Sequence, residues 1–358
     1  MIEIDGSIGE GGGQILRTSL SLACLTGRPI RIYNIRAERK TPGLKPQHLM
    51  SVTAAARVTH GEVRGATLGS GEVIFRPGPL SGGSFTFDVA AIKASAGSTG
   101  LIFQTIVLPL GFAHKGSCLT IKGGTHVEWS PSADYLREIF LPVLSRTGLK
   151  ITLENPVKGY YPMGGGEIDA RISPLSRPLK PLRIIERGNL KRVSVLSTVA
   201  NLPISIAERQ IKRTLERLKG LAAEIECRTI EAKSPGRGTS LLILSEFENI
   251  RAGFTALGAR GKRAEEVADE AVGDLLRYLN GKGAADPHLA DQIILPIALG
   301  YGESAISTTE ISGHLRTNME VIKKFLDVKF SLQEDRQRGW LIKVEGVSFK
   351  GNLFKGGE

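Results

Sequence analysis

Residues 104–113 read QTIVLPLGFA, and a closely similar run, QIILPIALGYG, returns at residues 292–302. A third run, QILRTSLSLA at residues 14–23, begins with the same glutamine and continues with apolar residues at helical spacing. The recurrence of one pattern three times indicates duplication of a strand–helix unit. The repeated glutamine is compatible either with a shared polar cavity or with helix capping.

The segments around these runs alternate between strand-like and helix-like patterns. Candidate strands cover residues 30–37, 72–78, 84–90, 117–124, 150–155 and 167–174, and candidate helices cover residues 14–25, 46–59, 99–113, 132–147 and 288–300. Such alternation predicts an α/β or α+β architecture.

The segment 184–280 has a different character, with two amphipathic helices and strands of its own. At 358 residues the chain exceeds the usual size of one core. We therefore expect a large domain made of residues 1–183 and 281–358, the latter holding the third repeat, with residues 184–280 inserted as a smaller domain. Its loop AKSPGRGTS, residues 232–240, is predicted to be a flexible tip.

The composition limits which kinds of partner and which cellular compartment are expected for this chain. The net charge of +11 predicts an anionic partner, nucleic acid being the commonest, although a merely basic surface would give the same charge. Three cysteines far apart predict buried free thiols in a reducing compartment. The first residues do not resemble a signal peptide, and the most apolar run, residues 100–113, is shorter than the roughly 20 residues that span a bilayer. We expect a cytoplasmic protein with no membrane partner.

A glycine-rich stretch, GEGGG at residues 9–13, directly precedes the first helix pattern. Glycines let backbone N–H groups approach a phosphate, and a helix N-terminus favours negative charge. The stretch is not a Walker loop, because no Gly-Lys-Ser/Thr closes it. Glu10 would repel a phosphate unless a divalent cation lay between them. The stretch is therefore either such an anion site or an ordinary turn.

His314 lies in SGHLRTN, between a strand pattern and a helix pattern. Donors from Arg316, Thr317 and Asn318 follow it, so an imidazole here is suited to attack phosphorus. The alternative is a junction histidine with satisfied hydrogen bonds.

A second glycine run, residues 164–166 in KGYYPMGGGEI, either admits close backbone approach or forms a bulge. The sequence contains no His-x-x-x-His pair of the kind found in zinc hydrolases and no Gly-x-Ser-x-Gly motif of the kind found in serine hydrolases, so neither class is predicted.

Taken together, GEGGGQILRTSLSL, IRAERKTPGLKPQHL, KGYYPMGGGEI, HLADQIILPIALG and SGHLRTN resemble the RNA 3′-terminal phosphate cyclase family, in the same order along the whole chain. The resemblance implies an α+β fold of three repeated βαβαββ-like units, similar to the enolpyruvyl transferases, with a smaller α/β domain inserted before the last unit. It also implies ATP-dependent conversion of an RNA 3′-phosphate end to a 2′,3′-cyclic phosphate through a histidine–AMP intermediate. AMP and pyrophosphate would be released, and the protein is a possible homo-oligomer.

The resemblance also implies roles for individual residues. His314 would be the nucleophile, and Glu10 would hold Mg²⁺ or Mn²⁺. Contacts to phosphate and RNA are implied for Gln14, Arg17, Arg36, Arg39 and Gln47. Contacts to ATP are implied for Gln104, Pro131, His288, Leu289, Ala290, Asp291 and Gln292. Asp291 would orient either the histidine or the nucleotide.

The sequence departs from the family pattern at two of these places. Lys158 stands where Arg or His is expected before the glycine triplet, which keeps a positive charge. His288 stands where some members carry Tyr against adenine, so imidazole stacking would be weaker.

Three alternatives remain: a cyclase-like ribosome-assembly protein without catalysis, an enolpyruvyl transferase, and a plain RNA-binding module. The joint presence of Glu10, Arg17, Asp291 and His314 argues against the first alternative. The second does not need a histidine nucleophile, and the third would explain the net charge of +11 but not a carboxylate within a glycine loop.

Overall fold

The computed structural model describes residues 1–351, and its first unit is a four-stranded sheet covered by two helices. The chain order is β1 (Ile2–Asp5), α1 (Gly13–Thr26), β2 (Ile30–Tyr33), α2 (Pro46–Thr59), β3 (Glu62–Arg64) and β4 (Val73–Arg76). The sheet order is β1-β2-β4-β3, in which β1 and β2 are parallel and the other pairs are antiparallel.

The second unit repeats this topology. It contains β5 (Ser84–Asp88), α3 (Thr99–Gly111), β6 (Ser117–Gly123), a helical stretch ending in α5 (Leu141–Arg146), β7 (Ile151–Val157) and β8 (Gly166–Ile172). The sheet order is β5-β6-β8-β7, again with one parallel and two antiparallel pairs. Helix α3 is buried almost all round, which explains its nearly continuous apolar sequence.

The third unit has the same topology but is interrupted. It contains β9 (Arg183–Ile184), α8 (Pro287–Leu299), β14 (Tyr301–Thr308), α9 (Gly313–Lys323), β15 (Lys329–Asp335) and β16 (Gly339–Val347), with sheet order β15-β16-β14-β9. Strand β9 is parallel to β14 and precedes the smaller domain in the chain. The smaller domain therefore follows the first strand of the last unit rather than preceding that unit, and the boundary predicted between residues 183 and 184 falls inside β9.

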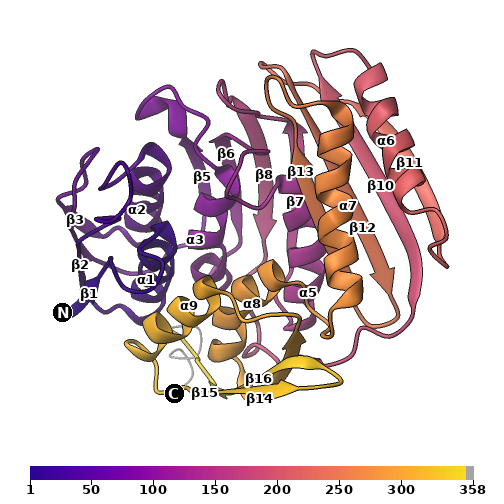
Figure 1. The fold of residues 1–358 in the computed structure, drawn as a ribbon. Helices are drawn as coiled ribbons and strands as arrows, with labels where there is room; N and C mark the ends of the chain where they lie inside the picture. Colours follow the sequence, from indigo (N-terminus) through magenta and orange to yellow (C-terminus); the bar gives the residue numbers. More distant parts are fainter. Residues whose placement is uncertain (352–358) are drawn as a thin grey trace.

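The intervening segment builds one further sheet. Its elements are β10 (Leu190–Ala200), α6 (Ser205–Arg217), β11 (Glu224–Glu231), β12 (Gly238–Phe247), β13 (Arg251–Leu257) and α7 (Ala264–Asn280), and its sheet order is β11-β10-β12-β13. Helices α6 and α7 pack against each other and against this sheet (Figure 1). With three βαβαββ units and this smaller α/β part, the predicted fold class is confirmed.

Helices from all three units pack together in the middle of the molecule, and the sheets of the units lie around them (Figure 1). Leu16 and Leu20 of α1, Ile106 of α3, Ile293 of α8 and Leu315 of α9 are fully or almost fully buried. The first turns of α1 and α9 are held against each other by this packing, which places their preceding loops at one site.

The helix predicted at residues 132–147 is present but irregular. It consists of α4 (Ala133–Tyr135), a π-helical stretch Leu136–Phe140 and α5. Pro142 has no N–H to donate to the preceding turn, and an extra residue in the turn before it accommodates this loss.

The structure also tests the predictions made for the cysteines and for membrane-spanning helices. All three cysteines are free, but only Cys24 is buried, so the expectation of burial is wrong for Cys118 and only partly right for Cys227. Within residues 1–351 no helix is both long enough and apolar enough to cross a membrane.

Candidate active site

The glycine-rich stretch connects β1 to α1 and takes the place of a helical turn. Gln104 and Gln292 are each the sixth residue of their helices, whereas Gln14 is the second residue of α1. Residues 9–13 therefore occupy the positions at which α3 and α8 form their first turn. Gly12 is the N-cap of α1 and no side chain caps this helix, so its first N–H groups remain available to an anion.

Close packing explains why glycines are required here. A Cβ atom on Gly13 would overlap Nε2 of His48 and lie 2.8 Å from a guanidinium nitrogen of Arg17. A Cβ atom on Gly313, at the start of α9, would overlap Oε1 of Glu10. Gly9 has φ +61° and faces the hydroxyl of Thr317. The loop is thus pressed against α9 from one side and against His48 from the other.

His314 lies in the first turn of α9 and faces Glu10. Its Nδ1 lies 3.0 Å from Oε2 of Glu10, although the two atoms are not aligned as a hydrogen bond. Nδ1 is buried while the side chain as a whole is 45% exposed, so the accessible part of the imidazole lies elsewhere on the ring. This arrangement leaves Nε2 as the ring nitrogen that a substrate can reach.

The electrostatic environment keeps His314 neutral. Burial is the main cause that lowers its pKa; Glu10 opposes this effect, and Arg17 and Arg39 add to it. A neutral imidazole at neutral pH has a free lone pair and is a nucleophile.

Helix α9 is joined to α1 and α8 through Asn318. Its Oδ1 accepts hydrogen bonds from Gln14 (3.0 Å) and Thr18 (2.7 Å), and its Nδ2 donates to the backbone carbonyl of Asp291 (3.2 Å). The Asp291 carboxyl accepts from Ser312, the N-cap of α9, at 2.5 Å. These bonds bring two predicted site residues, Gln14 and Asp291, to the helix that carries His314.

Burial raises the pKa of Asp291 to about 7, and the nearby charge of Glu10 contributes to this rise. Its carboxyl group therefore exchanges a proton in the physiological range. Because it binds Ser312 rather than the imidazole, its contact with His314 is indirect.

The predicted arginines differ in how far they are free to bind an anion. Arg17 donates to Oε1 of Gln14 at 2.9 Å, and burial lowers its pKa to about 10, so it remains charged at neutral pH. Arg39 is exposed and donates to the carbonyl of Glu10 at 2.7 Å. Arg36 donates to the carbonyls of Thr41 and Gly43 in its own loop. Arg17 and Arg39 thus flank the glycine loop, whereas Arg36 shapes the neighbouring one.

His48 was not predicted as a site residue, yet it contacts the glycine loop. It is buried, and its Nδ1 accepts from the backbone N–H of Lys45 at 3.2 Å, so Nε2 carries the proton. Burial lowers its pKa to about 3, with smaller contributions from nearby cations, and the ring is neutral. Only its neighbour Gln47 was singled out from the sequence, and the Gln47 carboxamide accepts from Ser98 N–H, at the start of α3, at 2.9 Å.

The residues predicted to bind nucleotide lie on α8, on α3 and, for Pro131, in the loop before α4. On α8, His288 is exposed, whereas Leu289 and Ala290 are buried in the core, so only their backbone can contact a ligand. Oε1 of Gln292 is buried and has no hydrogen-bond partner among residues 1–351. On the other side Pro131 packs on Gly100 of α3, and Gln104 lies one turn further along that helix.

Two buried groups behind α8 were missed. Asp286 caps α8 by accepting from Leu289 N–H at 3.0 Å, and it also accepts from the Tyr135 hydroxyl at 2.9 Å. Burial raises the pKa of Asp286. The sequence did hold a signal for the cap, since Asp followed by Pro is a common helix start.

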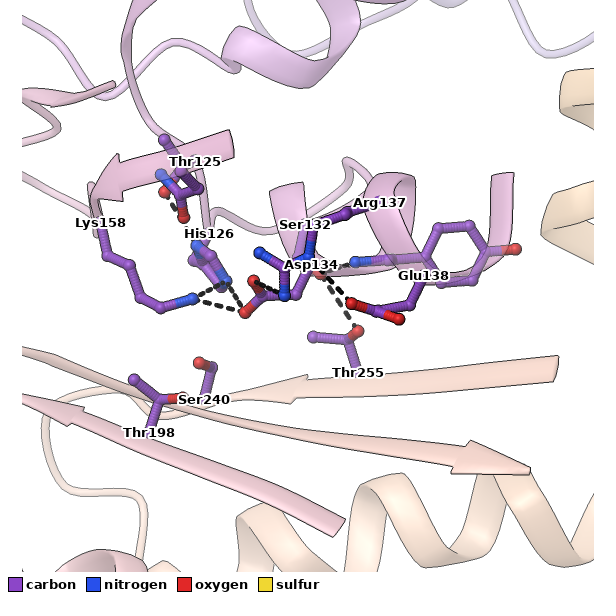
Figure 2. A network of polar contacts seen from close by, with 12 residues as sticks. Thr125, His126, Ser132, Asp134, Arg137, Glu138, Lys158, Thr198, Ser240 and Thr255 are labelled. Carbon is purple, nitrogen blue, oxygen red and sulfur yellow. Dashed lines mark hydrogen bonds and ion pairs between the residues drawn. The ribbon is translucent and has the colours of Figure 1, made fainter. Parts of the chain in front are cut away.

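The second glycine run lies at a different place, beside a buried polar network. Figure 2 shows Lys158, His126 and Asp134 turned toward one another, next to strand residues of the intervening segment. His126 is 2.9 Å from Asp134 and 3.1 Å from the Lys158 ammonium, which also binds Asp134. Gly159 and Gly166 approach each other's backbone, and Gly165 has φ +64°. Close backbone approach, one of the two predicted explanations, is therefore confirmed.

The described residues contain no cluster of three or more metal-ligating side chains. Glu10 supplies a carboxylate beside His314. A Mg²⁺ ion bound there would take its remaining ligands from phosphate oxygens and water, which is usual for this ion.

A model of the RNA 3′-terminal phosphate cyclase family matches residues 8–332. The chain belongs to this family. A relative from Pyrobaculum aerophilum with the name RNA 3′-terminal phosphate cyclase is 45% identical over 354 residues, which cover 97% of this chain and 99% of that protein. A relative of the same name from Methylococcus capsulatus is 44% identical over 91% of each chain. The resemblance recognised in the sequence is confirmed.

Among solved structures, the enolpyruvyl transferase NikO from Streptomyces tendae matches with a TM-score of 0.26 and 16% identity, over 48% of this chain and 33% of that chain. This likeness is too low to support the fold, which rests on the strand pairing described above.

Proposed function

We propose that this protein uses ATP to convert the 3′-terminal phosphate of an RNA into a 2′,3′-cyclic phosphate. Family membership supports the reaction class, and the observation that carries the mechanism is the accessible, neutral His314 beside Glu10 and the uncapped start of α1. His314 of α9, Glu10 of the glycine loop and the unsatisfied N–H groups of α1 meet at one site, which suits attack on a phosphoanhydride.

In the first step, Nε2 of His314 attacks the α-phosphorus of ATP. A nitrogen–phosphorus bond forms, the bond between the α-phosphorus and the bridging oxygen breaks, and pyrophosphate leaves. Arg17, Arg39 and the first N–H groups of α1 are placed to stabilise the charge on the phosphates. Glu10 would hold Mg²⁺ or Mn²⁺, which would neutralise charge on the departing pyrophosphate.

In the second step, an oxygen of the RNA 3′-phosphate attacks the same phosphorus and breaks its bond to His314, which leaves AMP joined to the RNA end. The neighbouring 2′-hydroxyl then attacks the terminal phosphorus and displaces AMP. This last attack is intramolecular, so it needs no further binding of a reactant. The buried, unpartnered Oε1 of Gln292 is an acceptor that a nucleotide hydroxyl or amino group would satisfy.

The test uses ATP labelled at the α-phosphate, with and without RNA. We expect His314→Ala to acquire no acid-labile label and to form no cyclic product, while its thermal unfolding midpoint stays close to that of the parent protein. A matched oligonucleotide ending in 2′-deoxyribose 3′-phosphate should accept AMP but stall as a capped end, since it lacks the 2′-hydroxyl. Normal labelling of the His314→Ala protein would contradict the proposal.

The role of Glu10 is tested separately. Glu10→Gln keeps the size of the side chain but removes the charge that would hold a cation, so labelling should slow strongly and recover in part at raised divalent metal. If the metal dependence of the variant matched that of the parent protein, Glu10 would only orient the imidazole.

A further inference from the structure

A groove of about 500 Å³ separates the second unit from the intervening segment. One wall is the turn between β7 and β8, with Tyr161 and Met163, and the other is the loop between β11 and β12, with Pro235 and Arg237. None of these residues belongs to the site around His314. The groove therefore needs an explanation of its own.

The two walls are held in fixed positions. The backbone N–H of Lys158 donates to the carbonyl of Lys233 at 2.8 Å, which ties the turn to the loop. The Asn201 side chain donates to the carbonyls of Ser234 and Gly236, both at 2.8 Å. The expectation that residues 232–240 form a flexible tip is therefore wrong. Residues 238–240 already belong to β12.

The buried network beneath the turn strengthens this anchorage. The Lys158 ammonium is bound to Asp134 and His126, so the residue that begins the turn is fixed at both its backbone and its side chain (Figure 2). In the same turn the Tyr160 hydroxyl lies 3.2 Å from the hydroxyl of Ser240 on β12. A groove with such walls is preformed and loses little entropy when a ligand binds.

The side chains that face outward have the chemistry of a surface for single-stranded nucleic acid. Tyr161 is 77% exposed and Met163 is 59% exposed, so an aromatic face and an apolar neighbour are both open to solvent. Lys233 and Arg237 are exposed, and no carboxylate of residues 1–351 forms an ion pair with either. Aromatic rings that stack on bases and free cations that contact phosphates are the two components of such surfaces.

A chain of contacts connects the groove to the candidate active site. A Cβ atom on Gly164, at the end of the turn, would lie 2.8 Å from Cα of Ala96. Two residues later Ser98 donates to Gln47, the neighbour of His48, and His48 packs against Gly13 of the glycine loop. The groove and the glycine loop are therefore held relative to each other through the buried residues Ser98 and His48.

We infer that this groove binds the single-stranded part of the RNA that precedes its 3′-phosphate, with a base stacked on Tyr161 and a backbone phosphate bound by Arg237. The inference rests on the proposed function and extends it, because it gives the intervening segment a part in substrate binding. Bases are recognised here by stacking, so the groove accepts different sequences.

The test compares a dinucleotide with an oligonucleotide of about ten nucleotides, which is within the range of site sizes on such surfaces. Both end in 3′-phosphate. Tyr161→Ala and Arg237→Ala should each raise the KM for the long RNA by about fivefold to a hundredfold. Neither variant should change the KM for the dinucleotide or the labelling of His314 by ATP. Arg237→Ala should also reduce the salt dependence of long-RNA binding by about one unit of slope.

Matched controls are Tyr301→Ala, at the exposed start of β14, and Arg228→Ala, an exposed arginine on β11; both should leave the KM for long RNA unchanged. Unchanged long-RNA kinetics in the Tyr161→Ala, Arg237→Ala double variant would overturn the inference. So would a change confined to sedimentation, which would make the groove a contact between copies of the chain. Absence of cyclic product from both RNAs in the parent protein would contradict the proposed function instead.

Discussion

His314 shows how one residue acquires reactivity from its neighbours. Its sequence context supplied polar donors, but the contact that matters, Nδ1 to Glu10 at 3.0 Å, comes from a residue about three hundred positions away. The imidazole is further kept neutral by burial and by Arg17 and Arg39. The environment of the proposed nucleophile is therefore defined by packing between the first and third units.

The lowered pKa of His314 predicts the acid side of its pH profile. A depressed pKa keeps the ring neutral as the pH falls, so the rate of labelling by ATP should hold below the ordinary value of about 6.5 and decline only in more acidic solution. Arg39→Ala removes a positive charge that lowers this pKa, so the decline should move to higher pH. Single-turnover labelling across a pH series checks both. A parent profile that already falls near pH 7 would contradict this explanation.

Asp291 should make the stability of the metal-free protein depend on pH. Its pKa is raised to about 7 in the folded chain, mainly by burial, whereas an unfolded Asp ionises at about 3.9. The protein therefore loses stability as the pH rises between these two values, where the unfolded chain has released the proton and the folded chain still holds it. Asp291→Asn keeps the acceptor for Ser312 and removes the charge. As the pH rises from 5 to 8, the free energy of unfolding of the variant should increase relative to that of the parent by about 1–2 kcal/mol, after allowance for the partial exposure of the group. Urea unfolding at pH 5 and at pH 8 measures the free energy of unfolding of both proteins. An equal difference between variant and parent at the two pH values would refute the prediction.

The glycine loop shows what can be predicted for an element and what cannot. The sequence indicated an anion loop or a turn before α1, and the repeated glutamines located the first helix of each unit. The register within those helices could not be predicted, because the missing first turn of α1 is visible only when Gln14 is compared with Gln104 and Gln292 in the structure. Likewise β9 has two residues and no pattern of its own, so its place in the third sheet depends on pairing with β14.

Two adjacent glycines of this loop should respond differently to one methyl group. A Cβ on Gly13 overlaps His48, which is buried and cannot move away without disturbing the start of α2, whereas a Cβ on Gly12 lies 3.4 Å from the exposed Arg39. Gly13→Ala should therefore lower the free energy of unfolding by about 1–3 kcal/mol. Gly12→Ala, the matched control, should change it little. Denaturant unfolding of both proteins provides the comparison, and equal losses would show that backbone freedom rather than space is required.

For the molecule as a whole, the repeats and a smaller inserted part could be predicted from the sequence. The surface between the second unit and the intervening segment could not. The polar network of His126, Asp134 and Lys158 lies beside this surface and joins two loop residues to a residue of α4 within the second unit. The pairing between Ser132 and Thr255, 3.3 Å apart, crosses the surface, and neither residue belongs to a recognisable motif for the contact. Such contacts depend on how the folded second unit and the folded intervening segment fit together, which many residues determine jointly.

This surface determines whether the molecule unfolds as one unit. Gly253 on β13 packs against the second unit so closely that a Cβ would lie 2.7 Å from Ile139 and 3.2 Å from Tyr135. Gly253→Leu should therefore separate the intervening segment from the second unit, and unfolding in denaturant should change from one transition to two. Gly71→Leu, at an exposed site with no atom within 4 Å of an added Cβ, is the control and should keep the parent behaviour. The separated walls would also abolish the preference for long RNA. Labelling of His314 by ATP would persist, because the contacts of His314 and the residues predicted to bind ATP lie outside the intervening segment. Loss of labelling together with the length preference would instead show that the intervening segment supports the nucleophile itself.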